Sequence, residues 1–186
     1  MGNNFEAAWD FKPPYSPYFL KEEPSRKGLG PMDKFQLASN AFAHKGTIPD
    51  LYTCRGRNIS PPFSFRNAPR GTEGYALIMV DLDTPVGTIT HWVVYNIPVE
   101  VGKLSEGILP GRLVANGVSQ GRNGMFRFGY MGPCPPWGRH RYLFRLFALD
   151  SMIRTESALN KRKLLRLMES HILAQAALLG YYPERG

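Results

Sequence analysis

The chain has 186 residues, of which 43% are apolar and 20% charged, a balance typical of one globular domain. No apolar run approaches the ~20 residues of a membrane-spanning helix, and the first residues lack the regions of a signal peptide, so a cytoplasmic location is expected. The net charge of +8 favours anionic partners, but the charges are scattered, so a solvated basic surface is an equal alternative.

The first 32 residues differ from the rest of the chain because aromatic residues alternate with prolines there. Proline prevents a long helix, and spaced aromatic residues suit an arm that lies on a surface. The arm could lie on its own domain, cover a neighbouring subunit or be partly disordered. Residues 33–186 are predicted to form the single domain, and their frequent glycine and proline residues favour a β-rich fold.

Three short apolar runs, at 75–80, 92–97 and 142–149, predict buried strands because β-branched and aromatic residues are frequent in them. The C-terminal segment has a different periodicity, because its apolar residues between Leu164 and Leu179 recur at helical spacing. Asn160 is the expected N-cap of this C-terminal helix, and Gly180 is its expected end.

Two segments carry most of the residues that could bind a ligand. The first, at 81–85, reads Asp-Leu-Asp-Thr-Pro and is followed by His91, while the second runs from Gly129 to Tyr142. Prolines in the second segment fix φ, and glycines let backbone N–H groups face a ligand, which predicts a stiff binding loop. A tight structural corner of the sheet is the alternative.

The side chains of these segments suit anion binding. His91 and His140 can donate hydrogen bonds to phosphate oxygens and add charge when protonated, although a lone histidine beside a tryptophan is more often a satisfied structural residue. Asp81 and Asp83 could orient a histidine, ligate a metal or cap a turn. Their spacing lacks a third metal ligand, so neither a metal nor another cofactor is expected.

Cys54 and Cys134 are the two cysteines, and neither has a partner at metal-ligand spacing. A bond between them requires Cα atoms within ~7 Å, which the sequence does not decide. Free thiols are expected in a reducing cytoplasm.

These motifs resemble those of the phosphatidylethanolamine-binding protein family, in particular its bacterial and archaeal branch, often called Raf-kinase-inhibitor-like. Similar stretches at 48–62 and 120–123 occur in the family's order, and the resemblance extends from about Phe35 to Tyr181. It implies a mostly β fold with peripheral helices, in which a central antiparallel Greek-key sheet is accompanied by a smaller second sheet and a C-terminal helix.

The resemblance also implies a small site at the sheet edge for phosphate-like or carboxylate anions. The residues it assigns to ligand binding are Asp81, His91, Cys134, Pro135, Pro136, His140 and Tyr142. The residues it assigns to support of the site are Asp83, Pro85, Gly132 and Arg141. Two departures from the family pattern are Leu82, where proline is common, and the large Trp137, which is expected to shade the mouth of the site.

The resulting hypothesis is a non-enzymatic anion-binding protein that regulates a kinase or inhibits a protease, with a homodimer suggested by the bacterial relatives. One alternative is a hydrolase with Asp81 and a histidine as acid–base pair and Cys134 as nucleophile. A nucleic-acid-binding protein is another alternative, motivated by the net charge and the aromatic arm, although no nucleic acid partner is expected. Membrane insertion is not expected.

Overall fold

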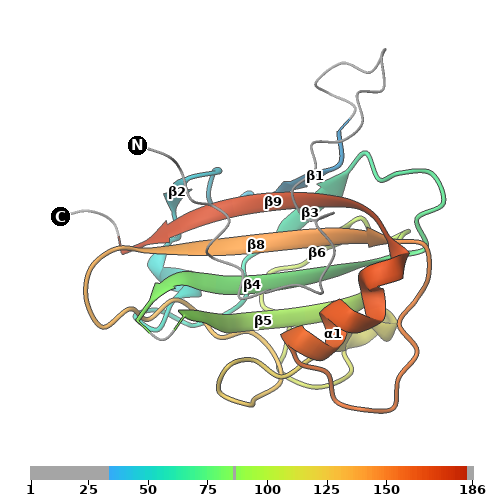
Figure 1. Cartoon of the computed structure of the whole chain (residues 1–186). Coiled ribbons are helices and arrows are strands. Elements are labelled where there is room, and N and C mark those ends of the chain that lie inside the picture. Colours follow the sequence, from blue (N-terminus) through green and yellow to red (C-terminus); the bar gives the residue numbers. More distant parts are fainter. Residues whose placement is uncertain (1–33, 86, 184–186) are drawn as a thin grey trace.

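The computed structural model describes residues 34–85 and 87–183, so the predicted arm at 1–32 lies outside the described residues. Within these ranges the chain forms nine strands, one α-helix and short 3₁₀ segments (Figure 1). The strands are β1 (Gln36–Ala38), β2 (Gly46–Thr47), β3 (Phe63–Arg66), β4 (Gly74–Thr84), β5 (Gly87–Pro98), β6 (Lys103–Leu104), β7 (Ser119–Gln120), β8 (His140–Leu149) and β9 (Ile172–Tyr182). The helices are η4 (Asp50–Tyr52), η5 (Ala115–Gly117), α1 (Lys161–Met168) and η6 (Glu169–His171).

The strands form two sheets, which confirms the predicted mostly β class. The larger sheet has the order β2-β9-β8-β4-β5-β7, and only the β2–β9 pair in it is parallel. The smaller sheet has the order β1-β3-β6 and is antiparallel. The three apolar runs at 75–80, 92–97 and 142–149 form the cores of β4, β5 and β8, as predicted.

The larger sheet is buried on both faces, which explains why its central strands are continuously apolar rather than alternating. On one face Trp92 and Phe144 pack against Phe63 of β3, with ring centroids 6.4 and 5.0 Å from it. On the other face Ile78 belongs to a cluster that contains the buried residues of α1, namely Leu164, Leu165 and Met168. Neither face is therefore open to solvent over the middle of the sheet.

The C-terminal helix is shorter than its apolar period predicts. It begins as expected after Asn160, whose side chain accepts a hydrogen bond from the Lys163 N–H at 3.0 Å. It ends at Met168, and the segment expected to be its second half is strand β9, which pairs along nearly the whole of β8. Apolar spacing in this Ala- and Leu-rich segment fits either state, and the sheet pairing with β8 overrides helix propensity.

Gly180 is therefore a strand residue and not the end of a helix. A Cβ atom at this position would lie 2.6 Å from Cγ1 of Ile48, which is too close for any larger side chain. The glycine thus lets the segment that carries β2 approach β9, with which β2 pairs in parallel.

The last residues of β4 and the first residues of β5 and β8 meet at one end of the larger sheet (Figure 1). Asp81 is the register partner of Ile89 on one side and of Tyr142 on the other. The topology therefore brings both candidate segments of the sequence to the same end. In the described part of the chain, no helix is long and apolar enough to cross a membrane.

Candidate functional site

A buried carboxylate–imidazole pair lies at this end of the sheet. His140 Nδ1 donates to Asp81 Oδ2 over 2.8 Å, and the two residues are only 6% and 3% exposed. The second carboxylate oxygen of Asp81 accepts the Asp83 N–H at 2.9 Å. Of the roles predicted for Asp81, the geometry matches the orientation of a histidine, since a carboxylate on Nδ1 turns Nε2 outward.

His91 is held by the second candidate segment rather than by Asp81. Its Nδ1 donates to the Met131 carbonyl at 2.7 Å, and the Met131 N–H donates to the His91 carbonyl at 3.0 Å. Burial lowers the pKa of His91, although the hydrogen bond to Met131 and the negative charge of Asp81 oppose that effect. His91 is therefore a mainly neutral imidazole whose Nδ1 is already committed to the protein.

The pKa shift of His91 predicts that the ligand-free protein loses stability in mild acid. A group with a lowered folded pKa binds protons more readily when unfolded, so stability falls as pH drops below the unfolded value of about 6.5. Urea unfolding midpoints measured in a phosphate-free buffer should be lower at pH 5.5 than at pH 7.5. His91→Gln should reduce that difference, and an unchanged difference in the variant would show that another group causes it.

Tyr142 joins the two imidazoles into one cluster. Its ring centroid lies 5.3 Å from that of His91 and 6.5 Å from that of His140. Its hydroxyl is buried without a hydrogen-bond partner of good geometry among the described residues. Burial raises the pKa of Tyr142, and the charge of Asp81 and hydrogen bonding to it raise it further, so the hydroxyl is a neutral donor whose interaction with Asp81 lacks good hydrogen-bond geometry.

Asp83 and Arg141 fasten β4 to β8 beside the cluster. The Asp83 carboxylate accepts two side-chain donors of Arg141, with Nε at 2.9 Å and Nη2 at 2.6 Å, and also the Arg141 N–H at 2.7 Å. Burial raises the pKa of Asp83, but the hydrogen bonds from Arg141 outweigh that effect and leave it below its usual range. The predicted supporting role of these two residues fits this geometry.

Asp83→Asn should cost only about 1 kcal/mol of unfolding free energy, because the Arg141 side chain is 43% exposed and solvent screens the pair. The loss should shrink in 1 M salt, since screening weakens the wild-type pair as well. Chemical denaturation of both proteins at two salt concentrations measures it. A salt-independent loss of 3 kcal/mol or more would mean that the pair behaves as a buried one.

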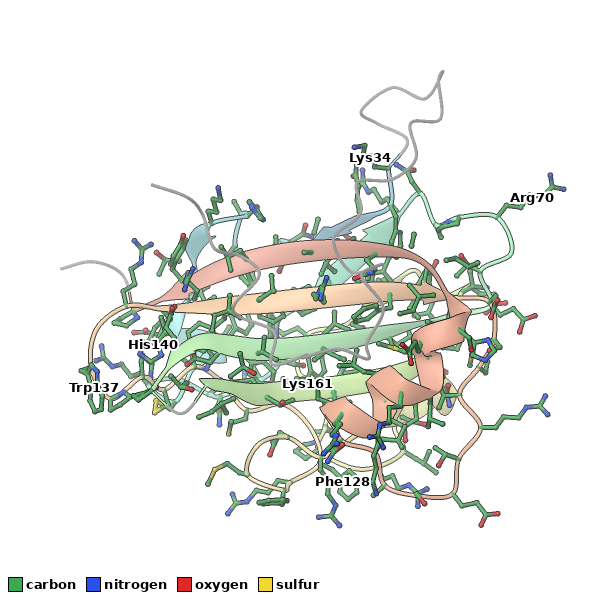
Figure 2. The ribbon with its side chains drawn as sticks, in the orientation of Figure 1. Lys34, Arg70, Phe128, Trp137, His140 and Lys161 are labelled. Atoms are coloured by element: carbon green, nitrogen blue, oxygen red, sulfur yellow. A yellow bond between two sulfur atoms is a disulfide. The ribbon has the colours of Figure 1, made fainter. Side chains whose placement is uncertain are left out.

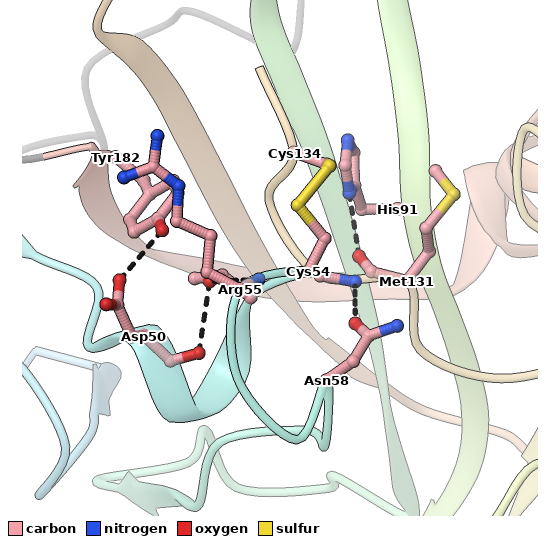
Figure 3. Close-up of a disulfide and its surroundings, with 10 residues drawn as sticks. Asp50, Cys54, Arg55, Asn58, His91, Met131, Cys134 and Tyr182 are labelled. Atoms are coloured by element: carbon pink, nitrogen blue, oxygen red, sulfur yellow. Dashed lines mark hydrogen bonds between the residues drawn. A yellow bond between two sulfur atoms is a disulfide. The ribbon is translucent and has the colours of Figure 1, made fainter. Parts of the chain in front are cut away.

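A disulfide joins Cys54 to Cys134, with Cα atoms 5.4 Å apart (Figure 3). The expectation of free thiols is therefore wrong, and so is the hypothesis of Cys134 as a nucleophile, because its sulfur is already bonded. The cysteines are 80 positions apart in sequence. Their proximity depends on tertiary contacts that spacing alone does not predict.

Backbone and side-chain hydrogen bonds reinforce the connection between these two loops. The Cys54 N–H donates to the Pro133 carbonyl at 3.1 Å, and the Gly132 N–H donates to Asn58 Oδ1 at 2.8 Å. Gly132 must be glycine because a Cβ atom there would lie 2.4 Å from the Tyr52 carbonyl oxygen. Asn58, which holds a left-handed backbone with φ of 56°, is a supporting residue that the sequence reasoning did not single out.

The remaining predicted residues differ in their exposure. Pro135 is half-buried, whereas Pro136 and Pro85 are exposed, Pro85 in the turn between β4 and β5. Trp137 lies at the same end of the molecule as His140 (Figure 2), but it is 67% exposed, so it does not pack over the cluster as expected. Leu82 packs with the apolar cluster on the α1 side of the sheet.

The fold and the cluster agree with comparisons to known proteins. Residues 38–183 match the family model described as phosphatidylethanolamine-binding protein, so the chain belongs to this family. Among curated relatives, a UPF0098 protein of Methanothermobacter thermautotrophicus is 44% identical over 146 residues, which cover 78% of this chain and 97% of the relative. A UPF0098 protein of Aquifex aeolicus is 43% identical over 151 residues, covering 79% and 87%.

Two solved structures share the fold. The phosphatidylethanolamine-binding protein homologue CT736 of Chlamydia trachomatis superposes with a TM-score of 0.76 at 39% identity, covering 82% of this chain and 99% of that chain. YbcL of E. coli, described as a new member of the mammalian PEBP family, gives a TM-score of 0.74 at 27% identity with the same coverage. The family membership makes this a ligand-binding fold.

Proposed function

We propose that the protein is a non-enzymatic binding protein for small anions that carry a phosphate or carboxylate group. The observation that carries the proposal is the buried Tyr142 hydroxyl, a donor without a hydrogen bond of good geometry, on a ring that neighbours two imidazoles. An unsatisfied buried donor costs about 1–3 kcal/mol, and an anion bound beside it would remove that cost.

The hydrogen-bond pattern specifies how an anion would be held. Nδ1 of His91 donates to Met131 and Nδ1 of His140 donates to Asp81, so a ligand must use Nε2 of each ring. Nε2 of a neutral ring with a protonated Nδ1 is an acceptor, so it binds a protonated oxyanion or takes up a proton to become a donor. Anion binding should therefore be accompanied by proton uptake near neutral pH.

A further unpartnered donor supports an anion at this end of the sheet. Nε of Arg139, the residue before His140, is buried and has no hydrogen-bond partner in the described ranges. Its guanidinium lies 4.2 Å above the Tyr181 ring, which fixes its position. Tyr181 packs with the apolar cluster on the α1 side of the sheet, whereas Tyr142 packs on the other side, so Arg139 adds positive charge to this end of the sheet without lining the cluster.

The bonded state of Cys134 supports the non-enzymatic part of the proposal, because it removes the nucleophile of the hydrolase hypothesis based on Asp81, a histidine and Cys134. The proposal also includes regulation of a kinase or inhibition of a protease, and a homodimer. These parts rest on family membership alone. So does a cytoplasmic location. In the cytoplasm the protein would carry its disulfide in a compartment where such bonds are rare and are commonly redox-sensing.

Calorimetric titration with inorganic phosphate and with phosphoethanolamine tests the proposal. Wild type should bind saturably and should be stabilised in a thermal shift assay, whereas His91→Ala should lose both effects. His171→Ala is the matched control, because the His171 side chain is 41% exposed, hydrogen-bonds to Asp150 and belongs to η6, which contributes no residue to the cluster. A folded wild type that binds neither ligand at millimolar concentration would refute the proposal.

A further inference from the structure

We propose that the Cys54–Cys134 disulfide is a redox-sensitive clamp on the anion site, so that its reduction weakens anion binding while the fold persists. The inference rests on the proposed function, because it names a regulation of the same site.

The disulfide is placed where a reductant can reach it. Cys54 and Cys134 are both exposed residues, unlike structural cystines that are enclosed in a core. Arg55, which Figure 3 shows beside the disulfide, and Arg57 follow Cys54 in the sequence and are exposed as well. Their positive charges attract an incoming thiolate.

The clamp acts mainly on the His91 side of the site. Cys134 lies three residues after Met131, whose carbonyl accepts the hydrogen bond that orients His91. His140 and Tyr142, in contrast, lie in β8, where the sheet positions their backbone: His140 pairs with Tyr182 of β9, and Tyr142 pairs with Asp81 of β4. Loosening that loop therefore disturbs His91 and leaves the His140–Asp81 pair intact.

Hydrogen bonds would limit the change after reduction. Three contacts still join the two loops: Cys54 N–H to the Pro133 carbonyl, Gly132 N–H to Asn58, and the Tyr130 hydroxyl to the Tyr52 carbonyl at 2.8 Å. After reduction the two loops remain near their positions, but a smaller fraction of the molecules has the loop arrangement that binds the anion. Since apparent affinity falls with the fraction of competent protein, the dissociation constant should rise about fivefold.

The chemistry is an ordinary thiol–disulfide exchange with a dithiol as reductant. One thiolate attacks a sulfur of the cystine, which breaks the S–S bond and forms a mixed disulfide, and the released cysteine sulfur takes a proton. The second thiol of the reductant then displaces the other cysteine. Two electrons and two protons pass to the protein, and the dithiol leaves as a cyclic disulfide.

Titration of inorganic phosphate into the full chain, oxidised and in excess dithiothreitol, tests the clamp. The dissociation constant should rise about fivefold on reduction, and far-UV circular dichroism should stay unchanged. Cys54→Ser/Cys134→Ser should bind like the reduced wild type and ignore dithiothreitol. Equal affinities in both redox states would overturn the inference, and so would loss of the β-sheet spectrum on reduction, since the cystine would then be a structural staple.

Imidazole resonances measured by NMR without ligand separate this inference from the proposed function. Reduction should shift the His91 resonances and leave those of His140 and His171 in place. If phosphate binds neither redox form, the proposed function is wrong, and the histidine resonances still decide whether the clamp acts on the site. Unchanged His91 resonances would refute it.

Discussion

Replacement of both cysteines by serine should lower the free energy of unfolding by about 4 kcal/mol. The disulfide closes a loop of 80 residues, and cross-linking a loop of that length removes about this much conformational freedom from the unfolded chain. Urea unfolding of oxidised wild type and of Cys54→Ser/Cys134→Ser measures the difference.

Wild type unfolded in dithiothreitol provides the control, because it should match the double variant to within experimental error. A loss of less than 1 kcal/mol would show that the cystine adds little to the two-loop contact that hydrogen bonds already make. Such a result would leave Cys54 N–H to Pro133 and Gly132 N–H to Asn58 as the main connection.

Asp81→Ala should destabilise the protein by about 3 kcal/mol, because it breaks a buried polar pair and leaves its partner without an acceptor. His140 is only 6% exposed, so water replaces the lost carboxylate poorly. The same change removes the acceptor of the Asp83 N–H. Chemical denaturation at pH 7 measures the loss.

Asp81→Asn is the informative companion, since an amide keeps the shape and can still accept from His140 Nδ1. It should recover more than half of the lost stability. If both variants were equally unstable, the negative charge of Asp81 would be the essential feature; if neither were destabilised, the pair would be open to solvent, contrary to the structure.

The sequence predicts the central strands well because their signal is local. Residues 75–80, 92–97 and 142–149 are continuous apolar runs, and a sheet covered on both faces requires such runs. The candidate site was predictable for a related reason, since Asp81, His91 and His140 lie at or near strand ends and the antiparallel pairing of β4, β5 and β8 brings those ends together.

The features that the sequence did not predict depend on contacts between distant segments. The segment at 172–182 has residues that favour helix, and only pairing with β8 makes it a strand. The disulfide and the Asn58–Gly132 hydrogen bond join residues 80 and 74 positions apart, for which one sequence holds no spacing signal. The left-handed backbone of Asn58 has only the weak local signal that asparagine tolerates this conformation.

Phosphate binding to Tyr142→Phe tests the anion site most directly, because phenylalanine removes only the hydroxyl, which makes no hydrogen bond of good geometry among the described residues. Without ligand the variant should be as stable as wild type or more stable, since no satisfied hydrogen bond is lost. Its phosphate affinity measured by calorimetry should be about tenfold lower, which corresponds to one lost hydrogen bond to a charged group. Unchanged affinity together with lowered stability would contradict the proposal and make the hydroxyl a structural group.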